Sequence, residues 1–479
     1  MNTILENFKK YVKNSPEKPA LIFDDEIISY KKLNELVNAL SNSLLYLKKG
    51  SIVSIFLDNS IDFVISYLGI LNAGMIAHLI PINLSDEKIK QQLENAIPEL
   101  VISSQSLIEK IKNIPYNCKK ITVIDLINNT STKQDDISHT NDIAYLIYTS
   151  GTTGVPKGVP ITHENVEFTT SNIITKLNYT SSDVNLLPLP LSHSFGLGCL
   201  HASLSVGSTL ILLKNATNTL SILESIKKNN VTTLAAVPLT LNKILKEHKN
   251  LCSNYLNNLR LIITNSTSIP VDTVKTYREI LKNGKLATYY GLTEASRSTF
   301  MIFEDSGREE SVGKPPSGIE IKIQNESTNE LEIGEILIKG KNVIKNYWMN
   351  EKANKKIIND WLSTGDLGHK DMDGYLYLSG RLDDLINIAG EKVMPADIEK
   401  VVKVLTGVED VLAIGMKNEM YGEVIKIFVK KSINTKITKS EILSHCIKNL
   451  ESFKVPREIE FVNDFSSDEF GKMKHFRGE

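Results

Sequence analysis

The sequence predicts an α/β fold: a large N-terminal domain of two similar α/β layers plus a small β subdomain, followed by a small α+β C-terminal domain. From residue 51 to about residue 290, strands alternate with helices, which is typical of parallel βαβ units. After Ser311, short strands are separated by Gly, Asn and Asp turns. Beyond Gly380, roughly a hundred residues remain, which is enough for a small domain.

The first layer begins with an apolar segment at residue 52, and its helices are marked by capping residues. Ser85 opens one helix with Asp86 and Glu87 in the first turn, where carboxylates favour the positive end of the helix dipole. The expected elements are strand Ile52–Leu57, helix Ser60–Asn72, strand Met75–Ile82, the helix after Ser85, and strands Leu100–Ser103 and Ile143–Ile147.

The second layer repeats the pattern. Its expected elements are strand Thr209–Leu213, helix Leu220–Asn229, strand Thr233–Val237, helix Leu241–His248, and strands Leu259–Thr264 and Leu286–Tyr289. Open α/β sheets bind ligands where their strands end, so we expect a ligand site near the junction of the two layers.

In the later part of the chain, short strands and turns replace the regular alternation of strands and helices. A β subdomain is expected at about 311–380, and a boundary at Gly380–Asp384 divides an N-terminal domain of residues 1–380 from a C-terminal domain of residues 381–479. The expected elements are strands Glu320–Gln324, Gly334–Ile338 and Tyr375–Leu378, helix Pro395–Val404, strands Val411–Met416 and Val424–Val429, and helix Lys439–Leu450.

Composition excludes several classes of protein. With 479 residues and a net charge of −1, the chain is of multidomain length and offers no electrostatic case for nucleic acid. Its four cysteines are widely spaced, so we expect no zinc site, no disulfide framework and a cytoplasmic location. Charged residues near the N-terminus argue against a signal peptide, and Pro81 and His78 interrupt the longest uncharged run, Phe63–Leu84, so no transmembrane segment is expected.

A glycine-rich loop follows the strand at Ile143–Ile147. Residues Thr149 to Gly158 contain four hydroxyls, three glycines and one lysine, a composition suited to wrapping a polyphosphate. The dinucleotide-binding pattern fails because Pro156 stands where its helix would start, and the P-loop fails because Lys157 is followed by Gly158. A kinase-like loop fails because no H-R-D or D-F-G occurs.

Two further strings supply groups for nucleotide chemistry. Tyr290-Gly-Leu-Thr-Glu294 offers an aromatic face for adenine, a hydroxyl donor at Thr293 and a hard oxygen ligand for Mg²⁺ at Glu294. In Ser363-Thr-Gly-Asp-Leu367, Asp366 is the residue type that accepts hydrogen bonds from both ribose hydroxyls. Arg381 follows in Gly380-Arg-Leu-Asp-Asp-Leu-Ile-Asn-Ile-Ala-Gly390, as a fixed cation for ribose or phosphate.

These strings together resemble the adenylate-forming superfamily, which comprises acyl-CoA synthetases, aryl-CoA ligases, luciferases and the adenylation domains of peptide synthetases. The resemblance covers about residues 20 to 475. It implies ATP and Mg²⁺, with Glu294 as metal ligand and Lys157, Thr293, Glu294 and Lys472 as catalytic residues. It implies that the nucleotide is bound by Thr149, Ser150, Gly151, Thr152, Thr153, Gly154, Tyr290, Gly291, Asp366 and Arg381.

The resemblance also implies a mobile C-terminal domain. Asp383 stands at the hinge about which this domain swings between one pose for adenylation and another for thiol attack, and Gly390 lies against the pantetheine in the second pose. Lys472 matches the late lysine that bridges the acid and the α-phosphate, with Lys474 as a nearby alternative.

The acid-binding segment is Leu189-Pro-Leu-Ser-His-Ser-Phe-Gly-Leu-Gly198, in which His193 and Phe195 match the residues that border the acid tunnel. Relatives that activate α-amino acids carry an aspartate where this chain has Gly196, so a carboxylic acid without an α-amine, aliphatic or aryl, is expected. Small residues would leave room for the acid; they are Gly196, Gly198, Ala235, Ala236, Ala295 and Ser296. Arg297 either meets an acidic substrate end or faces solvent, and we favour solvent.

Two departures from the family pattern are present: Thr264–Pro270 replaces a glycine-rich adenine-contacting turn, and Asn346 replaces a common glycine. The predicted activity is that of an AMP-forming acyl-CoA synthetase, an acid–thiol ligase. One alternative is a ligase that loads the acid onto the phosphopantetheine of an acyl carrier protein, and another is an inactive nucleotide-binding partner protein. A luciferase-like oxygenase is not excluded by these motifs. The sequence does not fix the oligomeric state.

Overall fold

The structure, a computed structural model, describes residues 3–128, 142–150, 156–265, 269–304, 307–325, 330–388, 391–418, 421–433 and 435–465. The chain divides into two compact units, and the divisions fall within strands. The first unit comprises residues 1–320 and 338–362, and the second comprises residues 321–337 and 363–479. Among the described residues, no helix is long and apolar enough to cross a bilayer.

The first unit contains most of the helices. They are α1 (Ile4–Asn14), α2 (Tyr30–Ser43), α3 (Ile61–Asn72), α4 (Asp86–Ala96), α5 (Gln105–Ile111), α6 (Val123–Asn128), α7 (His163–Leu177), α8 (Ser194–Val206), α9 (Thr219–Lys228), α10 (Pro238–Tyr255), α11 (Val271–Ile280) and α12 (Glu351–Asn354). Several begin where expected; Ser60 caps α3, for example, by accepting a hydrogen bond from the backbone N–H of Phe63.

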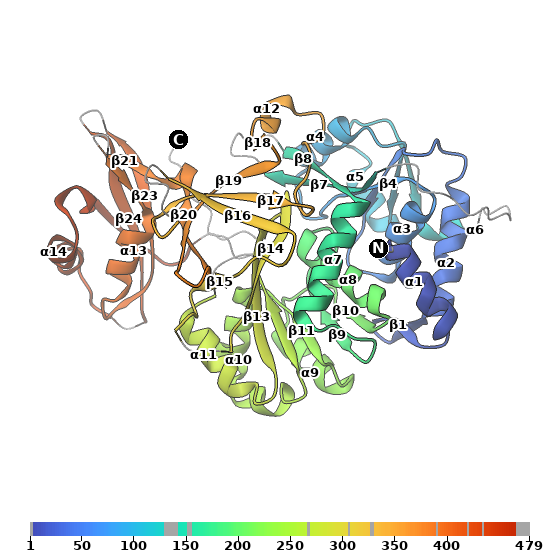
Figure 1. The fold of residues 1–479 in the computed structure, drawn as a ribbon, viewed down its shortest axis with the longest axis horizontal. Coiled ribbons are helices and arrows are strands. Elements are labelled where there is room, and N and C mark those ends of the chain that lie inside the picture. The colour runs from blue at the N-terminus through green and yellow to red at the C-terminus, as the bar shows by residue number, and fades with distance from the viewer. Residues whose placement is uncertain are drawn as a thin grey trace. The chain divides into compact units, whose positions relative to one another are not determined.

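Two sheets form the layers of this unit, which confirms the predicted pair of α/β layers (Figure 1). One has the order β6-β5-β3-β4-β7-β8, and its strands are β3 (Ile52–Phe56), β4 (Ile76–Leu79), β5 (Leu100–Ser103), β6 (Lys119–Thr122), β7 (Ile143–Ser150) and β8 (Pro156–Thr162). The other has the order β14-β13-β12-β11-β9-β10-β1-β2, and its strands are β1 (Pro19–Phe23), β2 (Glu26–Ser29), β9 (Val184–Leu187), β10 (Thr209–Leu212), β11 (Thr233–Ala235), β12 (Leu261–Thr264), β13 (Lys285–Leu292) and β14 (Ala295–Ile302).

Each sheet is parallel in its interior and ends in an antiparallel hairpin. The pairs β3/β4 and β4/β7 are parallel, whereas β7/β8 is antiparallel. Likewise, β11/β12 and β12/β13 are parallel, whereas β13/β14 is antiparallel. Helix α7 contacts α8, β8 and β14, so it packs against the outer strand of both hairpins (Figure 1). The two hairpins carry the two motifs that the sequence singled out.

The core between the layers is apolar and includes helix α3, which is buried on all sides. Its Tyr67 makes a hydrogen bond of 2.8 Å with His201 of α8, which satisfies two polar groups inside an otherwise apolar core. The first fifty residues, in which no elements were predicted, contribute α1, α2 and the strands β1 and β2, and β1 extends the second sheet beside β10.

The second unit contains two groups of strands. Strands β20 (Leu376–Arg381), β19 (Trp361–Lys370), β17 (Gly334–Gly340) and β16 (Ile319–Gln324) follow one another in that order. The other group has the order β22-β21-β24-β23, with β25 beside β24; its strands are β21 (Ile386–Ile388), β22 (Glu391–Val393), β23 (Val408–Asn418), β24 (Gly422–Lys431) and β25 (Glu458–Val462). Helices α13 (Pro395–Lys403) and α14 (Lys439–Asn449) accompany the second group, which has an apolar core of its own. The remaining strands of the chain are β15 (Ser311–Gly313) and β18 (Ile357–Ile358).

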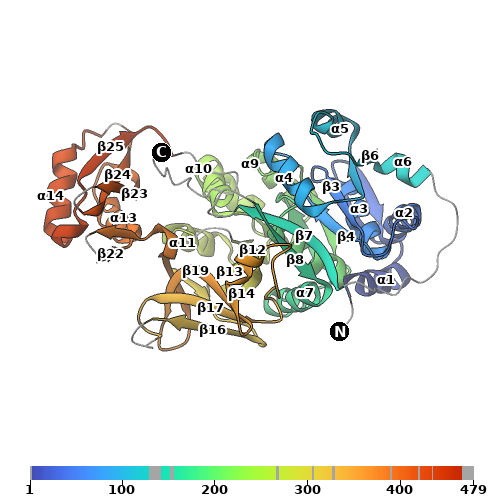
Figure 2. The same ribbon diagram turned by 90° about the horizontal axis from the view of Figure 1, so that it is seen from above.

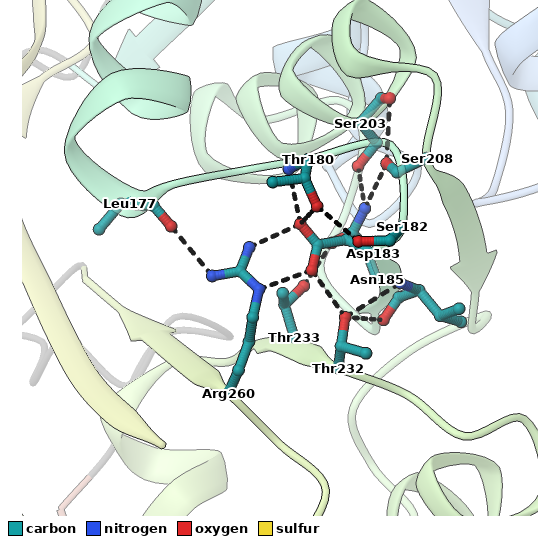
Figure 3. A network of polar contacts seen from close by, with 11 residues as sticks. Leu177, Thr180, Ser182, Asp183, Asn185, Ser203, Ser208, Thr232, Thr233 and Arg260 are labelled. Carbon is teal, nitrogen blue, oxygen red and sulfur yellow. Dashed lines mark hydrogen bonds and ion pairs between the residues drawn. The ribbon is translucent and has the colours of Figure 1, made fainter. Parts of the chain in front are cut away.

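An ion pair between a buried carboxylate and a partly exposed guanidinium joins the amino ends of three parallel strands in the first unit (Figure 3). The Asp183 carboxylate, just before β9, accepts from Arg260 Nε and Nη2 at 2.6 Å each, and also from the Thr232 hydroxyl at 2.9 Å. Arg260 and Thr232 directly precede β12 and β11. Burial alone would raise the pKa of Asp183, but the hydrogen bonds from Arg260, Thr180 and Thr232 outweigh it and hold this pKa below its usual value.

Replacing Asp183 by Asn tests this ion pair. The substitution leaves the Arg260 guanidinium without its carboxylate, but this guanidinium is partly exposed, so we expect unfolding in urea to require about 2 kcal/mol less free energy. Because the folded pKa is lowered, the stability that Asp183 contributes is present above its unfolded value and is lost as the pH falls through the folded pKa. Below about pH 4 the difference between Asp183→Asn and the parent should therefore shrink.

The exposed pair Asp25–Lys228, whose N–O distance is 3.0 Å, provides the control. Asp25→Asn should change the free energy of unfolding by less than about 1 kcal/mol. Equal losses in the two variants would show that the buried pair has no special part in joining the strands.

Candidate active site

The β7/β8 hairpin fixes both ends of the phosphate-binding loop. Thr149 lies opposite Lys157, and Ser150 lies opposite Pro156. The loop residues Gly151, Thr152, Thr153 and Gly154 lie outside the described part of the chain, as does the Ser150 side chain. The expected strand at Ile143–Ile147 is longer than predicted, since β7 continues to Ser150 and carries Thr149 within the sheet. The structure thereby brings the hydroxyl of Thr149 and the cation of Lys157 to the same end of the hairpin.

The stem of this hairpin is anchored at Gly158. The Gly158 carbonyl accepts from the backbone N–H of Trp348 at 2.8 Å, and a Cβ on Gly158 would lie 2.8 Å from Trp348 Cβ. Helix α4 packs on β8 (Figure 2). Its Asn95 accepts through Oδ1 from the Tyr148 hydroxyl and through its carbonyl from Trp348 Nε1. Three hydrogen bonds therefore hold the base of the loop in place.

The Tyr290–Glu294 motif lies in the second hairpin. Strand β13 continues to Leu292, three residues beyond the expected end, and Thr293 and Glu294 form the turn before β14. A Cβ on Gly291 would lie 2.5 Å from the backbone N of Arg297 and 2.7 Å from the carbonyl of Ala295, so this turn accepts only glycine without opening. Thr293 and Glu294 are both partly exposed, whereas Tyr290 is buried.

Residues 342–348 connect the two hairpins. The backbone N–H of Ile344 donates to the Glu294 carbonyl at 3.0 Å, and the Tyr347 hydroxyl donates to Glu294 Oε1 at 3.2 Å. The next residue, Trp348, makes the bond to Gly158 described above. Burial and then the Glu294 carboxylate raise the pKa of Tyr347, so its hydroxyl remains a proton donor. The stem of the predicted phosphate loop and the Thr-Glu turn are thus held in a fixed relation by one short segment.

The acid-binding segment forms the start of helix α8. His193 is the N-cap residue, and Phe195 is buried with its ring edge against Tyr289 at a centroid distance of 5.3 Å. Burial lowers the pKa of His193 to about 4, so the imidazole is neutral at pH 7 and suited to lining.

Two glycines of α8 do not provide the room that the sequence suggested. A Cβ on Gly196 would lie 2.3 Å from the Pro190 carbonyl oxygen, and a Cβ on Gly198 would lie 2.3 Å from Arg297 Nη2. The space beside them is therefore already filled by protein, and the expectation of room for the acid at these two positions is wrong. An aspartate in place of Gly196 would meet the same Pro190 carbonyl oxygen, so it could be accepted only if the backbone shifted.

The expectation that Arg297 faces solvent is wrong as well. Its side chain is buried, with 3% of the residue exposed, and its guanidinium donates to the carbonyls of Ser194 and Phe195 at 2.9 and 3.0 Å. The carbon Cζ lies 4.7 Å from the centre of the Tyr289 ring. The burial of Arg297 was not predicted, because an arginine that follows a polar turn is usually exposed. The hydrophobic residues that follow Arg297 in the sequence were the available indication of burial.

The second unit holds the other candidate nucleotide contacts. Asp366 and Arg381 lie opposite each other on β19 and β20, and Arg381 Nη1 donates to Asp366 Oδ1 at 2.6 Å. The sequence suggested two separate contacts to the nucleotide, and the structure pairs these two side chains. Asp383 is exposed in the short 3-10 helix Leu382–Asp384 that follows β20. Gly390, Lys472 and Lys474 lie outside the described residues.

Two α/β layers that end in a phosphate-loop hairpin and a Thr-Glu hairpin, followed by a small α+β unit, define the architecture of an adenylate-forming enzyme. The family model for the AMP-binding enzyme matches residues 8–348, and that for the AMP-binding enzyme C-terminal domain matches residues 397–472. The chain belongs to the AMP-binding enzyme family.

Relatives extend over nearly the whole chain. The oxalate–CoA ligase of Arabidopsis thaliana is 30% identical over 99% of this chain and 97% of its own length. The long-chain-fatty-acid–CoA ligase of Salmonella typhimurium is 28% identical, with 98% and 93% covered. The o-succinylbenzoate CoA synthetase of Bacillus subtilis, solved with its acyl-adenylate intermediate, is 28% identical with a TM-score of 0.85, and 98% and 96% are covered. The same synthetase has also been solved with ATP and a magnesium ion, with a TM-score of 0.85 and 98% of both chains covered.

Substituting Gly291 by Ala tests the geometry of the Thr-Glu hairpin. The added methyl group meets backbone atoms on the opposite strand, which cannot move without breaking the turn. We expect a loss of about 1–3 kcal/mol in the free energy of unfolding, measured in urea.

Gly198→Ala is the matched control. There the methyl group meets the end of a long side chain, and alanine also favours the helix by up to about 1 kcal/mol. Its loss should be smaller; an equal or greater loss would contradict the view that the hairpin backbone is the rigid element.

Proposed function

We propose that this protein is an AMP-forming acyl-CoA ligase that activates a carboxylic acid lacking an α-amine. The carboxylate oxygen attacks the α-phosphorus of ATP, the bond to the bridging oxygen breaks, and pyrophosphate leaves. The CoA sulfur then attacks the acyl carbon, the bond to AMP breaks, and the thiol proton is released. The observation that carries this proposal is the linkage of the phosphate-loop stem to Glu294 through residues 342–348.

The first unit supplies the groups for adenylation. Thr149 and Lys157, at the end of their hairpin, bind the departing phosphates together with the loop between them. Thr293 donates to the α-phosphate, where charge develops during the transfer. Phe195 and His193 border the acid, and Tyr290 with Gly291 borders the adenine.

Magnesium fits Glu294. Its residue is partly exposed at a turn, and the hydrogen bond from Tyr347 fixes Oε1, whereas Oε2 accepts no hydrogen bond from the described residues. The described residues contain no cluster of three or more His, Cys, Asp or Glu side chains, so a metal bound here would share its coordination with phosphate oxygens and water. Bound there, Mg²⁺ would neutralise charge on the phosphates.

The second unit supplies the ribose and thiol contacts. Asp366, oriented by Arg381, accepts hydrogen bonds from the ribose hydroxyls. Residues 381–479 form a mobile domain hinged at Asp383, which presents Lys472 to the α-phosphate in one pose and Gly390 to the pantetheine in the other. The match of a separate C-terminal domain model to residues 397–472 supports this assignment.

CoA is the proposed thiol, since the relatives that span the whole chain are CoA ligases. Transfer to the phosphopantetheine of a carrier protein uses the same arm and is the alternative. A cytoplasmic location is proposed on the cysteine spacing alone.

Acid-dependent exchange of labelled pyrophosphate into ATP tests the first half-reaction, and a panel of acids identifies the substrate. The best acid is then incubated with ATP and either CoA or a holo carrier protein. We expect exchange that requires the acid, followed by thioester formation with CoA. Nucleotide binding without exchange for any acid would instead support an inactive partner protein.

Replacing Lys472 by Ala separates the half-reactions. Loss of a cation directed at charge that develops in the transition state should slow adenylation about a hundred- to a thousand-fold. Conversion of supplied acyl-adenylate to thioester should persist, because it takes place in the other pose. Lys474→Ala is the control, and equal loss of both half-reactions would contradict the assignment.

Replacing Tyr347 by Phe removes the hydroxyl that orients Glu294. We expect the Mg²⁺ concentration for half-maximal exchange to rise about 10-fold, as is typical when the partner of a metal ligand is removed. Tyr277→Phe, which loses a buried 3.0 Å hydrogen bond to the Leu241 carbonyl, should leave the Mg²⁺ dependence unchanged. A Tyr347→Phe variant with unaltered Mg²⁺ dependence would show that the carboxylate needs no such support.

A further inference from the structure

Arg297 is a buried cation without a counter-ion among the described residues. Three other arginines, Arg260, Arg278 and Arg381, each pair with a carboxylate. Arg297 forms no such pair within the described ranges, and its partners there are neutral: the carbonyls of Ser194 and Phe195, the Ser296 hydroxyl and the Cys199 thiol. Taking a charge out of water without an opposite charge is unfavourable, so a missing anion is implied.

The backbone at Arg297 is strained. Its φ of +54° lies in the left-handed region, which is unfavourable for a residue other than glycine. Such strain persists only where the surroundings impose it, and it gathers at ligand sites. The neighbouring helix makes room for the guanidinium at Gly198, where a side chain would collide with it. The fold thus accepts both a conformational and an electrostatic cost to hold this cation.

The surroundings of Arg297 belong to the acid-binding segment. The two carbonyls that hold its guanidinium are those of Phe195, which matches a residue that borders the acid tunnel, and of Ser194, which lies between the two matched positions. The Tyr289 ring packs against both Phe195 and the guanidinium. The Tyr289 hydroxyl is buried beside the Asn265 side chain, and the Arg297 guanidinium lies beside the Cys199 thiol. The acid segment therefore meets a phenol and a guanidinium, and neither has a carboxylate partner among the described residues.

From these observations we infer that Arg297 recognises a second acidic group of the substrate, so that the acid activated is a dicarboxylic acid or another acid with an anionic far end. The inference rests on the proposed function and names the class of acid for that same site. The carboxylate that reacts is directed to the Thr293–Glu294 turn, and the second acidic group is directed to Arg297 and the Tyr289 hydroxyl. An acid with an apolar end would leave the guanidinium unpaired.

The test compares kcat/KM in acid-dependent pyrophosphate exchange for monocarboxylic and dicarboxylic acids of equal carbon number, with about three to eight carbons. Benzoate and its carboxylated analogues extend the comparison to aryl acids. The full-length parent should prefer the diacid. In Arg297→Met the diacid should lose about 100-fold, because truncation of one partner of a buried charge pair leaves the other unpaired. The matched monoacid should change by less than about 3-fold, a split that a purely structural arginine would not produce.

Arg297→Lys guards against failure of Arg297→Met to fold, because it keeps the charge in a side chain of similar reach. It should retain a reduced preference for the diacid, and diacid binding measured by calorimetry should weaken in the same order. A parent that prefers monoacids, an equal loss for both acids in Arg297→Met, or a lysine variant that prefers monoacids would each overturn the inference while leaving the ligase activity in place. Absence of exchange with every acid would overturn the proposed function, and this inference with it.

Discussion

The candidate site depends on one constraint: the hairpins at the ends of the two sheets must keep a fixed position relative to each other. Residues 342–348 set this position, because they form hydrogen bonds to Gly158 on one hairpin and to Glu294 on the other. Asn165 of α7 fixes this segment in turn by donating to the carbonyls of Lys341 and Val343 at 2.7 and 3.2 Å. Because helix α7 also packs on β8 and β14, the same helix supports both hairpins and their link.

The opposite edge of the second sheet is held differently. There the Asp183–Arg260 pair and Thr232 gather the amino ends of β9, β11 and β12, whereas the polar groups assigned to chemistry follow the carboxyl ends of strands. The amino ends of the strands thus form a hydrogen-bonded base, and the carboxyl ends lead into short hairpins and turns. This arrangement is expected of an open α/β sheet that binds ligand at the carboxyl ends of its strands. The acid segment at the start of α8 belongs to the same edge, since it follows β9.

Much of this fold is predictable from the sequence because parallel strands that are buried on both faces appear as short apolar segments between capped helices. Strands β3, β5 and β10 and helices α3 and α9 were located to within about two residues, as was the start of α4, which is the usual precision for boundaries. Helix α8 was not predicted: it is buried on all sides and contains Gly196 and Gly198, so it lacks both an amphipathic pattern and helix propensity. Its glycines become intelligible only from the Pro190 carbonyl and the Arg297 side chain that occupy their space.

The site was predicted unevenly for a related reason. The residue type of motif residues such as Thr149, Glu294 and Asp366 indicates their chemistry, but the residues that hold them in place cannot be identified in this way. Tyr347 was not predicted, because only the structure shows that its hydroxyl lies beside Glu294. Arg297 was predicted to face solvent, because its burial depends on contacts with a helix that is distant in the sequence. Tertiary contacts therefore decide which polar residues serve the site.

In the proposed reaction, one oxygen of the acid becomes bonded to the α-phosphorus of ATP. Activation of an acid labelled with ¹⁸O in its carboxylate, followed by transfer to CoA, tests this directly by mass spectrometry of the nucleotide. Our account predicts AMP that carries one ¹⁸O atom for each thioester formed. Label recovered in inorganic phosphate with ADP as the product, or AMP without label, would contradict it.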